Sequence, residues 1–287
     1  MNELMIIPLL VLALLQGLLE YLPVSSEGQI LLIAANIYYF TPEFALSVIF
    51  WLHLGTAFTV IVFYRHDIFS SLAIQIRPPK EERQNAGNES RKLFGPLFVF
   101  VVAGTIGTVI VALPLYFLLR SLVTVLLGSF VTLLVGILLI ATGIVLYFQP
   151  SVQGDLTLGD ISLREAFVLG LLQGVAVLPG ISRSGMTLTW LLVRGVRRDE
   201  ALRLSLLLGV PAAFGVVTVD LIFGNVILIV PLIPILLVLM VVAFATGLGA
   251  LAVFRYYALK LPWWIFCLIL GIIVVALTVP LILIGGT

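Results

Sequence analysis

Cysteine, histidine and charged residues are all scarce in this chain of 287 residues. The one cysteine, Cys267, lies in an apolar run, which excludes an intramolecular disulfide and gives no basis for dithiol redox chemistry. Charged residues make up 10% and the formal net charge is +1, so the chain has no basic surplus with which to bind nucleic acid. The first apolar stretch lacks the basic residues and the small-residue cleavage site of a secretory signal, so we expect it to stay in the mature protein.

Apolar residues dominate the composition instead. They make up 62% of the chain, with a mean hydropathy of +1.26, which predicts an all-α polytopic membrane protein with one membrane domain over 1–287. A full span needs about 20 apolar residues. Six segments are long enough: 42–64, 93–118, 121–147, 199–222, 226–254 and 262–285. Four shorter ones are half-spans: 4–19, 26–37, 163–178 and 185–194.

The half-spans form two pairs, each interrupted by Pro, Gly and Ser. The segments "LLQGLLEYLPVSSEG" (14–28) and "LLQGVAVLPGISRSG" (171–185) match at Leu, Leu, Gln, Gly, Ser and Gly under a constant offset, which indicates an internal repeat with halves 1–147 and 160–287. Each half holds one broken, re-entrant helix pair and three transmembrane helices. Because three is odd, the second half enters the membrane in the opposite orientation, and this inverted repeat brings two broken helices together near the midplane.

The basic residues agree with that topology, because Lys and Arg accumulate in cytoplasmic loops. If the loop 65–92 is cytoplasmic, alternation of the spans places every basic residue on that side except Arg120, which is outside, and Arg183, which lies in the second break. Both termini are then extracytoplasmic. The first broken pair dips in from outside and the second from inside, so that their tips meet.

The two tips carry the polar residues of a candidate site. Gln16 and Glu20 share one helix face at i, i+4, and Ser25 and Ser26 follow Pro23 at the start of the next half-helix. The second tip, "PGISRSGMT", supplies a comparable set: Ser182, Arg183, Ser184 and Thr187. Helix N-termini bind anions, and two of them facing each other beside a guanidinium predict a phosphate or diphosphate clamp.

Structural roles for the same residues stay open. Ser26 and Gln29 fit a capping box, Ser182 and Ser184 could cap a helix, and Arg183 could pair with Glu20 for stability alone. His53 lies near the centre of the first full span and level with the tips, where it is either a buried structural histidine or part of the site. Intramembrane charges are costly, which favours a functional reading for Glu20 and Arg183.

The two tip segments together resemble the signatures of the bacitracin-resistance family of undecaprenyl-diphosphate phosphatases, and the similarity continues through "DEALRLSLLLGVPA" over nearly the whole chain. The resemblance implies a cell-membrane enzyme that recycles a carrier lipid by hydrolysing its diphosphate to the monophosphate and inorganic phosphate, with a divalent cation such as Mg²⁺ or Ca²⁺. By position, Gln16 and Glu20 match the family's Glu/Gln-x-x-x-Glu motif. Ser26 matches a proposed nucleophile or phosphate contact, and Arg183 the diphosphate-binding arginine.

The chain departs from the family at three positions. Family members usually read "PVSSTGH" where this chain has "PVSSEGQ", so Gln29 replaces a histidine and Glu27 a threonine. They also commonly have Gln where this chain has His53. Since glutamine cannot exchange a proton at neutral pH, we hypothesise that the imidazole has moved to His53. This hypothesis predicts that His53→Gln abolishes turnover and that adding Gln29→His restores part of it.

The expected catalytic set is therefore Glu20, Ser26, Arg183 and His53, with Gln16, Ser25, Gln29, Ser182, Ser184 and Thr187 around the substrate and Glu20 and Glu27 on the metal. Either Ser26 attacks the terminal phosphorus or a metal-bound water does, and the sequence does not choose. A different class stays open as well, since an inverted repeat is a transporter architecture and the protein could flip polyprenyl phosphate without hydrolysis. The expected partners are the lipid substrate and membrane lipids, with a homodimer left open.

Overall fold

The structure is a computed structural model that describes residues 5–76, 95–125, 128–150, 154–224, 232–257 and 261–284. In those ranges the regular elements are helices, apart from one β-bridge between Leu156 and Val196. Six helices are long and apolar enough to cross a membrane, which confirms the predicted spans. They are α3 (Pro42–Phe63), α6 (Pro96–Val125), α7 (Gly128–Tyr147), α10 (Arg198–Phe223), α12 (Ile233–Tyr257) and α13 (Trp263–Leu283).

Four shorter helices occupy the positions of the predicted half-spans: α1 (Ile6–Leu19), α2 (Ser26–Asn36), α8 (Leu163–Val175) and α9 (Arg183–Val193). The longest of them has 14 residues. At 1.5 Å of rise per residue this gives about 21 Å, less than the roughly 30 Å hydrocarbon core of a bilayer. These helices are thus too short to cross alone.

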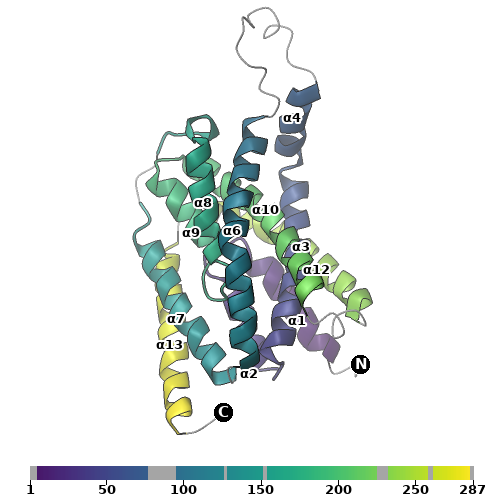
Figure 1. Cartoon of the computed structure of the whole chain (residues 1–287), viewed down its shortest axis with the longest axis vertical. Coiled ribbons are helices and arrows are strands. Elements are labelled where there is room, and N and C mark those ends of the chain that lie inside the picture. Colours follow the sequence, from purple (N-terminus) through teal and green to yellow (C-terminus); the bar gives the residue numbers. More distant parts are fainter. Residues whose placement is uncertain are drawn as a thin grey trace, which may run out of the picture.

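The two broken pairs keep the predicted spacing. The starts of α1 and α8, at Ile6 and Leu163, and of α2 and α9, at Ser26 and Arg183, are both 157 residues apart. The packing is also reciprocal, since α1 lies against α12 and α8 against α6, while α3 packs on α10 and α7 on α13 (Figure 1). The inverted orientation of the two halves stays a prediction.

One helix was not predicted. The sequence led us to expect a cytoplasmic loop over 65–92, with no helix assigned to it; its first part forms α4 (Arg65–Ile76), and 77–94 lie outside the described residues. Asp67 on α4 accepts a hydrogen bond of 2.5 Å from Arg203 on α10, and Glu200 accepts two more from the same guanidinium. This long-range ion pair holds α4 in place, and the charge pattern that suggested a loop gives no sign of it.

A second polar contact joins α6 and α10 close to the far end of α10. Asp220, with a side chain only 2% exposed, accepts a hydrogen bond of 3.0 Å from Tyr116 and lies 3.2 Å from the guanidinium of Arg120. The hydrogen bond and the ion pair allow the Asp220 carboxylate to be buried. They also give a structural role to Arg120, the one basic residue that the predicted topology leaves at the extracytoplasmic surface. In Figure 1 the start of α1 and the end of α13 lie toward the end of the bundle opposite α4.

Candidate active site at the junction of two helix breaks

The two helix breaks contact each other directly. The hydroxyl of Ser25, the N-cap of α2, accepts a hydrogen bond of 3.1 Å from the backbone N–H of Gly180 in the second break. In return, the hydroxyl of Ser184 donates a 3.0 Å hydrogen bond to the carbonyl of Leu22 in the first break. Each break thus satisfies a backbone group of the other, which unsatisfied at membrane depth would cost several kcal/mol. The tips meet as the sequence predicted.

Local backbone conformation permits this close approach. Ser25 has φ 56°, in the left-handed region, and Gly180 has φ 111°. Residues other than glycine rarely adopt such values, and they tend to do so at functional sites where the surrounding structure holds them. A Cβ atom on Gly28, in the first turn of α2, would lie 2.8 Å from the Gly180 nitrogen. The junction therefore needs a residue without a side chain at position 28.

We expect Gly28→Val to separate the two breaks and to lower turnover by about 100-fold or more, because small misplacements of catalytic groups are costly. Phosphate release and circular dichroism of the purified variant would check this. The matched control is Gly249→Ala on α12, where an added Cβ meets nothing within 4 Å. Wild-type turnover in Gly28→Val would show that the contact between the breaks is dispensable.

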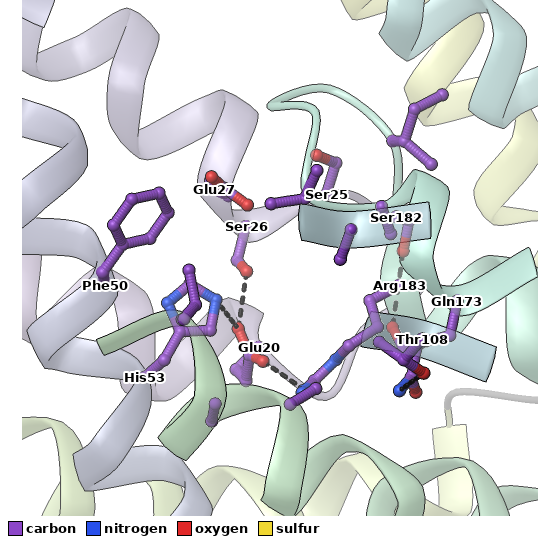
Figure 2. Close-up of a pocket in the computed structure, with 18 of the residues that line it drawn as sticks. Glu20, Ser25, Ser26, Glu27, Phe50, His53, Thr108, Gln173, Ser182 and Arg183 are labelled. Atoms are coloured by element: carbon purple, nitrogen blue, oxygen red, sulfur yellow. Dashed lines mark hydrogen bonds and ion pairs between the residues drawn. The ribbon is translucent and has the colours of Figure 1, made fainter. Parts of the chain in front are cut away.

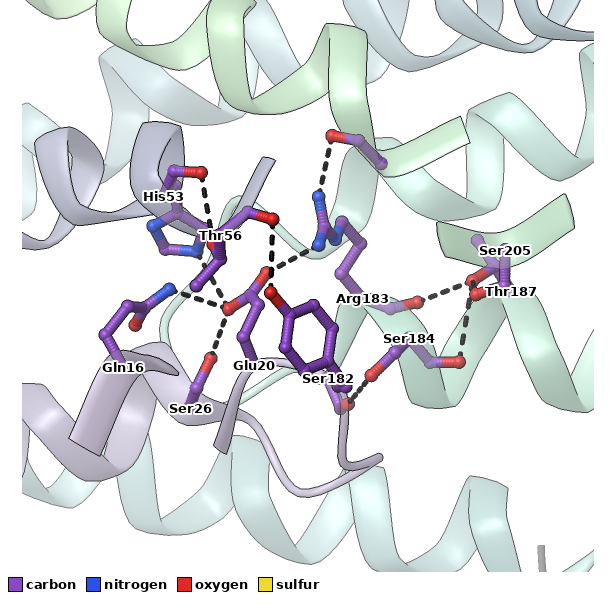
Figure 3. A network of polar contacts seen from close by, with 12 residues as sticks. Gln16, Glu20, Ser26, His53, Thr56, Ser182, Arg183, Ser184, Thr187 and Ser205 are labelled. Atoms are coloured by element: carbon purple, nitrogen blue, oxygen red, sulfur yellow. Dashed lines mark hydrogen bonds and ion pairs between the residues drawn. The ribbon is translucent and has the colours of Figure 1, made fainter. Parts of the chain in front are cut away.

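Glu20 is the centre of the polar network at this junction (Figure 3). Its Oε2 accepts hydrogen bonds of 2.7 Å from the amide of Gln16 and of 2.7 Å from the hydroxyl of Ser26. Its Oε1 accepts a 2.5 Å hydrogen bond from Nη2 of Arg183, across the two halves of the chain. With a side chain 4% exposed, this carboxylate is buried but fully partnered, which is the condition for keeping a charge at such depth.

His53 completes the network from α3. Its Nδ1 lies 2.8 Å from the carbonyl oxygen of Ile49, a contact that only a protonated Nδ1 can make favourable. Its Nε2 lies 3.5 Å from Oε2 of Glu20 and faces the candidate site. The ring is therefore oriented by the backbone of its own helix, with Nε2 directed to where a proton would be exchanged.

Arg183, the first residue of α9, has donors to spare. Besides the bond to Glu20, its Nη1 donates a 2.8 Å hydrogen bond to the carbonyl of Gly209 on α10. A guanidinium has five N–H groups, so the remaining ones are free for another anion. Ser182 caps the same helix by accepting from the N–H of Gly185 at 3.0 Å. The start of α9 thus offers a fixed cation, a helix dipole and free backbone N–H groups at one place.

These groups surround a cavity of about 100 Å³ (Figure 2). Its wall is polar at the junction, where it includes Glu20, Ser25, Ser26, Glu27, His53, Ser182, Arg183 and Ser184. Apolar side chains also line it: Leu22 and Ile181 from the two breaks, Phe50 from α3, Ala112 from α6, and Ala212, Ala213 and Val216 from α10. A wall with both polar and apolar side chains suits an amphiphile with an anionic head.

Two buried oxygen atoms in the wall have no hydrogen-bond partner: Oε1 of Glu27 and Oε1 of Gln173. Buried polar atoms are nearly always satisfied, so each of these two calls for a ligand, a water or an ion. Glu27 supplies a carboxyl group, and the described part of the chain has no cluster of three or more His, Cys, Asp or Glu side chains that could hold a metal alone. A cation here would need further ligands from the substrate.

The structure places the sequence-predicted residues in two groups. Glu20, Ser25, Ser26, Glu27, His53, Ser182, Arg183 and Ser184 line the cavity. Gln16, Gln29 and Thr187 lie behind it: Gln16 donates to Glu20, Gln29 donates to the Val24 carbonyl at 2.6 Å, and Thr187 bonds to Ser205 and to the Arg183 carbonyl. These three side chains support the loop and the helix that carry the site.

Three polar residues near the site were not predicted from the sequence: Gln173, Thr108 and Thr142. Gln173 lines the cavity and donates to Thr108 on α6 at 3.0 Å and to the Leu208 carbonyl on α10 at 3.3 Å. Thr142 on α7 donates to the Gly180 carbonyl and accepts from the Ser182 N–H, fixing the second break. For Gln173 there was a signal, since it stands 157 residues after Gln16 in the repeat. Threonines in apolar helices give no such signal.

Comparison with known proteins covers almost the whole chain. The family model described as "Bacitracin resistance protein BacA" matches residues 9–276. A Methanothrix thermoacetophila protein named "Undecaprenyl-diphosphatase" is 38% identical over 94% of this chain and 95% of its own length. Proteins of the same name from Haloarcula marismortui and Desulforudis audaxviator are 35% and 37% identical, over 91% and 72% of this chain and 93% and 72% of their own.

Proposed function

This chain belongs to the bacitracin resistance protein BacA family, and we propose that it is a multi-pass membrane phosphatase that hydrolyses an undecaprenyl-type diphosphate to the lipid monophosphate and inorganic phosphate. Such a reaction regenerates the monophosphate form of a carrier lipid, which can then be used again. The observation that carries the proposal is the convergence of Arg183, Glu20 and Ser26 with two helix N-termini on one cavity with an apolar extension. An anionic head and a hydrocarbon tail are the two parts that this cavity fits.

In this proposal, the terminal phosphate binds at the junction of the two breaks. Arg183 directs its free N–H groups at the phosphate oxygens, and the first turns of α2 and α9 add backbone donors and their dipoles. Glu20 and the Gly209 carbonyl hold the guanidinium in its orientation, so that little ordering is needed when substrate arrives. Most of the catalysis of phosphoryl transfer comes from such positioning and charge stabilisation.

Two routes for the bond exchange remain. In the first, Ser26 Oγ attacks the terminal phosphorus, its proton passes to the Glu20 carboxylate at 2.7 Å, and the bond to the bridging oxygen breaks with departure of the lipid monophosphate. Water then hydrolyses the phosphoserine. In the second, water attacks the phosphorus directly and Glu20 or His53 takes its proton. Trapping of a phosphoserine separates the routes, because only the first forms one, whereas water supplies one oxygen of the released phosphate in both.

The donor set fits a divalent cation only as a partner of the substrate. Mg²⁺ commonly uses one or two carboxylates together with phosphate oxygens and water, and Glu27, with an unpartnered oxygen in the cavity wall, would be its protein ligand. Glu20 is poorly placed for that role because both of its oxygens already accept hydrogen bonds. When bound, the cation would neutralise charge on the diphosphate.

The proposal is tested by inorganic phosphate release from the purified protein with undecaprenyl diphosphate, with and without Mg²⁺. Release that Glu20→Gln abolishes would support the phosphatase. A folded protein that binds the lipid without releasing phosphate would overturn it and favour transport of polyprenyl phosphate, which flux into liposomes would then measure.

We expect Glu27→Gln to raise the Mg²⁺ concentration needed for half-maximal phosphate release by about 10-fold or more, because removal of one carboxylate removes about 1.4 kcal/mol or more of cation binding. Direct binding of Mg²⁺ in the presence of the lipid diphosphate gives a second readout. Glu43→Gln, in the first turn of α3 and away from the cavity, is the matched control. An unchanged requirement for Mg²⁺ would remove Glu27 from the cation site.

The sidedness of the protein and its oligomeric state belong to the proposal as well. With 65–92 cytoplasmic, both termini are extracytoplasmic, and a homodimer is the assembly we left open. Reaction of single introduced cysteines with an impermeant maleimide in intact cells would establish the sidedness, with Cys267 buried and out of reach.

A further inference from the structure

Apolar side chains of α6 and α10 line part of the cavity, and two polar contacts join these helices before and after that stretch. On one side Gln173 bridges the helices by donating to Thr108 on α6 and to the Leu208 carbonyl on α10. On the other, Tyr116 of α6 donates to Asp220 of α10, and Arg120 lies beside the same carboxylate. The residue numbers of the two contacts increase in the same direction on both helices, from Thr108 to Tyr116 on α6 and from Leu208 to Asp220 on α10, so α6 and α10 run parallel here.

Between these two contacts the helices present small side chains to the cavity. Ala112 on α6 and Ala212, Ala213 and Val216 on α10 belong to its wall. Thr108 and Ala112 are i, i+4 and therefore lie on one face of α6, which connects the inner polar contact to the apolar wall. The stretch covers about 12 Å of α6 and about 18 Å of α10, from the helical rise between the bounding residues.

This wall reaches the outer surface of the bundle. Ala112, Ala212 and Val216 are partly exposed, while Ala213 and Phe50 behind them are buried. Gly215 lies in the same stretch of α10, and a Cβ added to it would meet nothing within 4 Å. The surface of these apolar spans contacts hydrocarbon in a membrane, so a window from the site between α6 and α10 would open into lipid rather than into water.

We infer that the hydrocarbon chain of the lipid substrate leaves the site through this window between α6 and α10, with Ala112, Ala212 and Val216 against the isoprene units that follow the first. The inference rests on the proposed phosphatase function and names the path that it requires. A phosphate bound at Arg183 lies next to the apolar part of the wall, because Arg183 bonds to the Gly209 carbonyl on α10, about one turn before Ala212 and Ala213.

The test places a bulky side chain in the window, either from α10 or from α6. We expect Ala212→Phe and Ala112→Phe each to lower kcat/KM for undecaprenyl diphosphate by about 100-fold, and to lower it at least 10-fold less for isopentenyl diphosphate, whose short chain ends inside the cavity. Ala252→Phe is the matched control: Ala252 is exposed on the surface of α12 and lines no part of the cavity, so both substrates should be hydrolysed as by wild type. Equal losses on both substrates, or none, would overturn the window.

A binding measurement separates failure of the window from failure of the proposed function. Native mass spectrometry of the intact protein with undecaprenyl phosphate reports lipid occupancy without requiring hydrolysis. If the wild type binds this lipid but releases no phosphate from undecaprenyl diphosphate, the phosphatase is wrong while the window is still tested by loss of occupancy in Ala212→Phe and Ala112→Phe. Occupancy equal to wild type in both variants would overturn the window even where hydrolysis is found.

Discussion

Replacing Arg183 by lysine is expected to lower kcat/KM for the lipid diphosphate by about 10³-fold, in the range of other arginines that stabilise phosphoryl transfer. In the structure the guanidinium serves Glu20 Oε1 and the Gly209 carbonyl and still keeps N–H groups for substrate. An ammonium has three donors around one nitrogen and no planar fork. It can neutralise Glu20 or bind the phosphate, but it cannot hold the geometry of both.

Two comparisons keep this result interpretable. Arg194→Lys changes an arginine whose side chain is 47% exposed and which pairs with Glu165 at the surface, so it should leave turnover within about two-fold, as expected for an exposed pair. Arg183→Ala additionally leaves the buried Glu20 without its cationic partner from α9, and its unfolding temperature should fall more than that of the lysine variant. Near-normal hydrolysis in Arg183→Lys would show that a point charge suffices and that the fork geometry has no role.

Much of this site could be predicted because its residues violate the composition around them. Glu20 and Arg183 stand out in a chain with 10% charged residues, and the Pro, Gly and Ser interruptions mark where helices cannot continue. The repeat then relates the two interruptions before any contact is known. A buried charged side chain is costly unless another group pairs with it. A charged residue in an apolar segment therefore predicts that its partner lies close to it in the fold.

The direction of side chains could not be predicted in the same way. Ser26 and Gln29 lie in one helical turn of α2, yet Ser26 contacts Glu20 in the cavity wall while Gln29 turns to the Val24 carbonyl. That difference depends on how the preceding loop closes, with Ser25 in a left-handed conformation that a sequence pattern does not specify. The contact between Ser25 and Gly180 likewise joins residues 155 positions apart. The ion pair that orders α4 is non-local for the same reason.

Satisfaction of Glu20 also explains why the network extends over three helices. A carboxylate at this depth needs several donors, and it takes them from α1, α2 and α9, with His53 of α3 nearby. Each donor is held in turn, Arg183 by Gly209 and His53 by Ile49. The same contacts that make the charge tolerable thereby fix the cation, the hydroxyl and the imidazole relative to each other. Stability and preorganisation have one structural origin here.

His53→Gln is expected to lower kcat by about 10² to 10⁴-fold with little change in KM, the loss typical of removing a general acid or base. Nδ1 is occupied by the Ile49 carbonyl, and Nε2 points at the oxygen of Glu20 that also accepts from Ser26. A glutamine can keep a hydrogen bond there but cannot carry a proton between water and Glu20. His66→Gln on the exposed surface of α4, the only other histidine of the chain, is the control and should be neutral.

The double variant His53→Gln with Gln29→His then tests whether the imidazole has exchanged positions. The sequence alone suggested that the second change restores turnover, whereas the structure predicts no rescue, because the side chain at position 29 bonds to Val24 and lies behind the cavity wall. Recovery of phosphate release would mean that a histidine at this position swings into the cavity and that the two sites are equivalent. Full activity of His53→Gln would instead show that Glu20 and water transfer the proton without the imidazole. His53 would then be only a structural partner of the carboxylate.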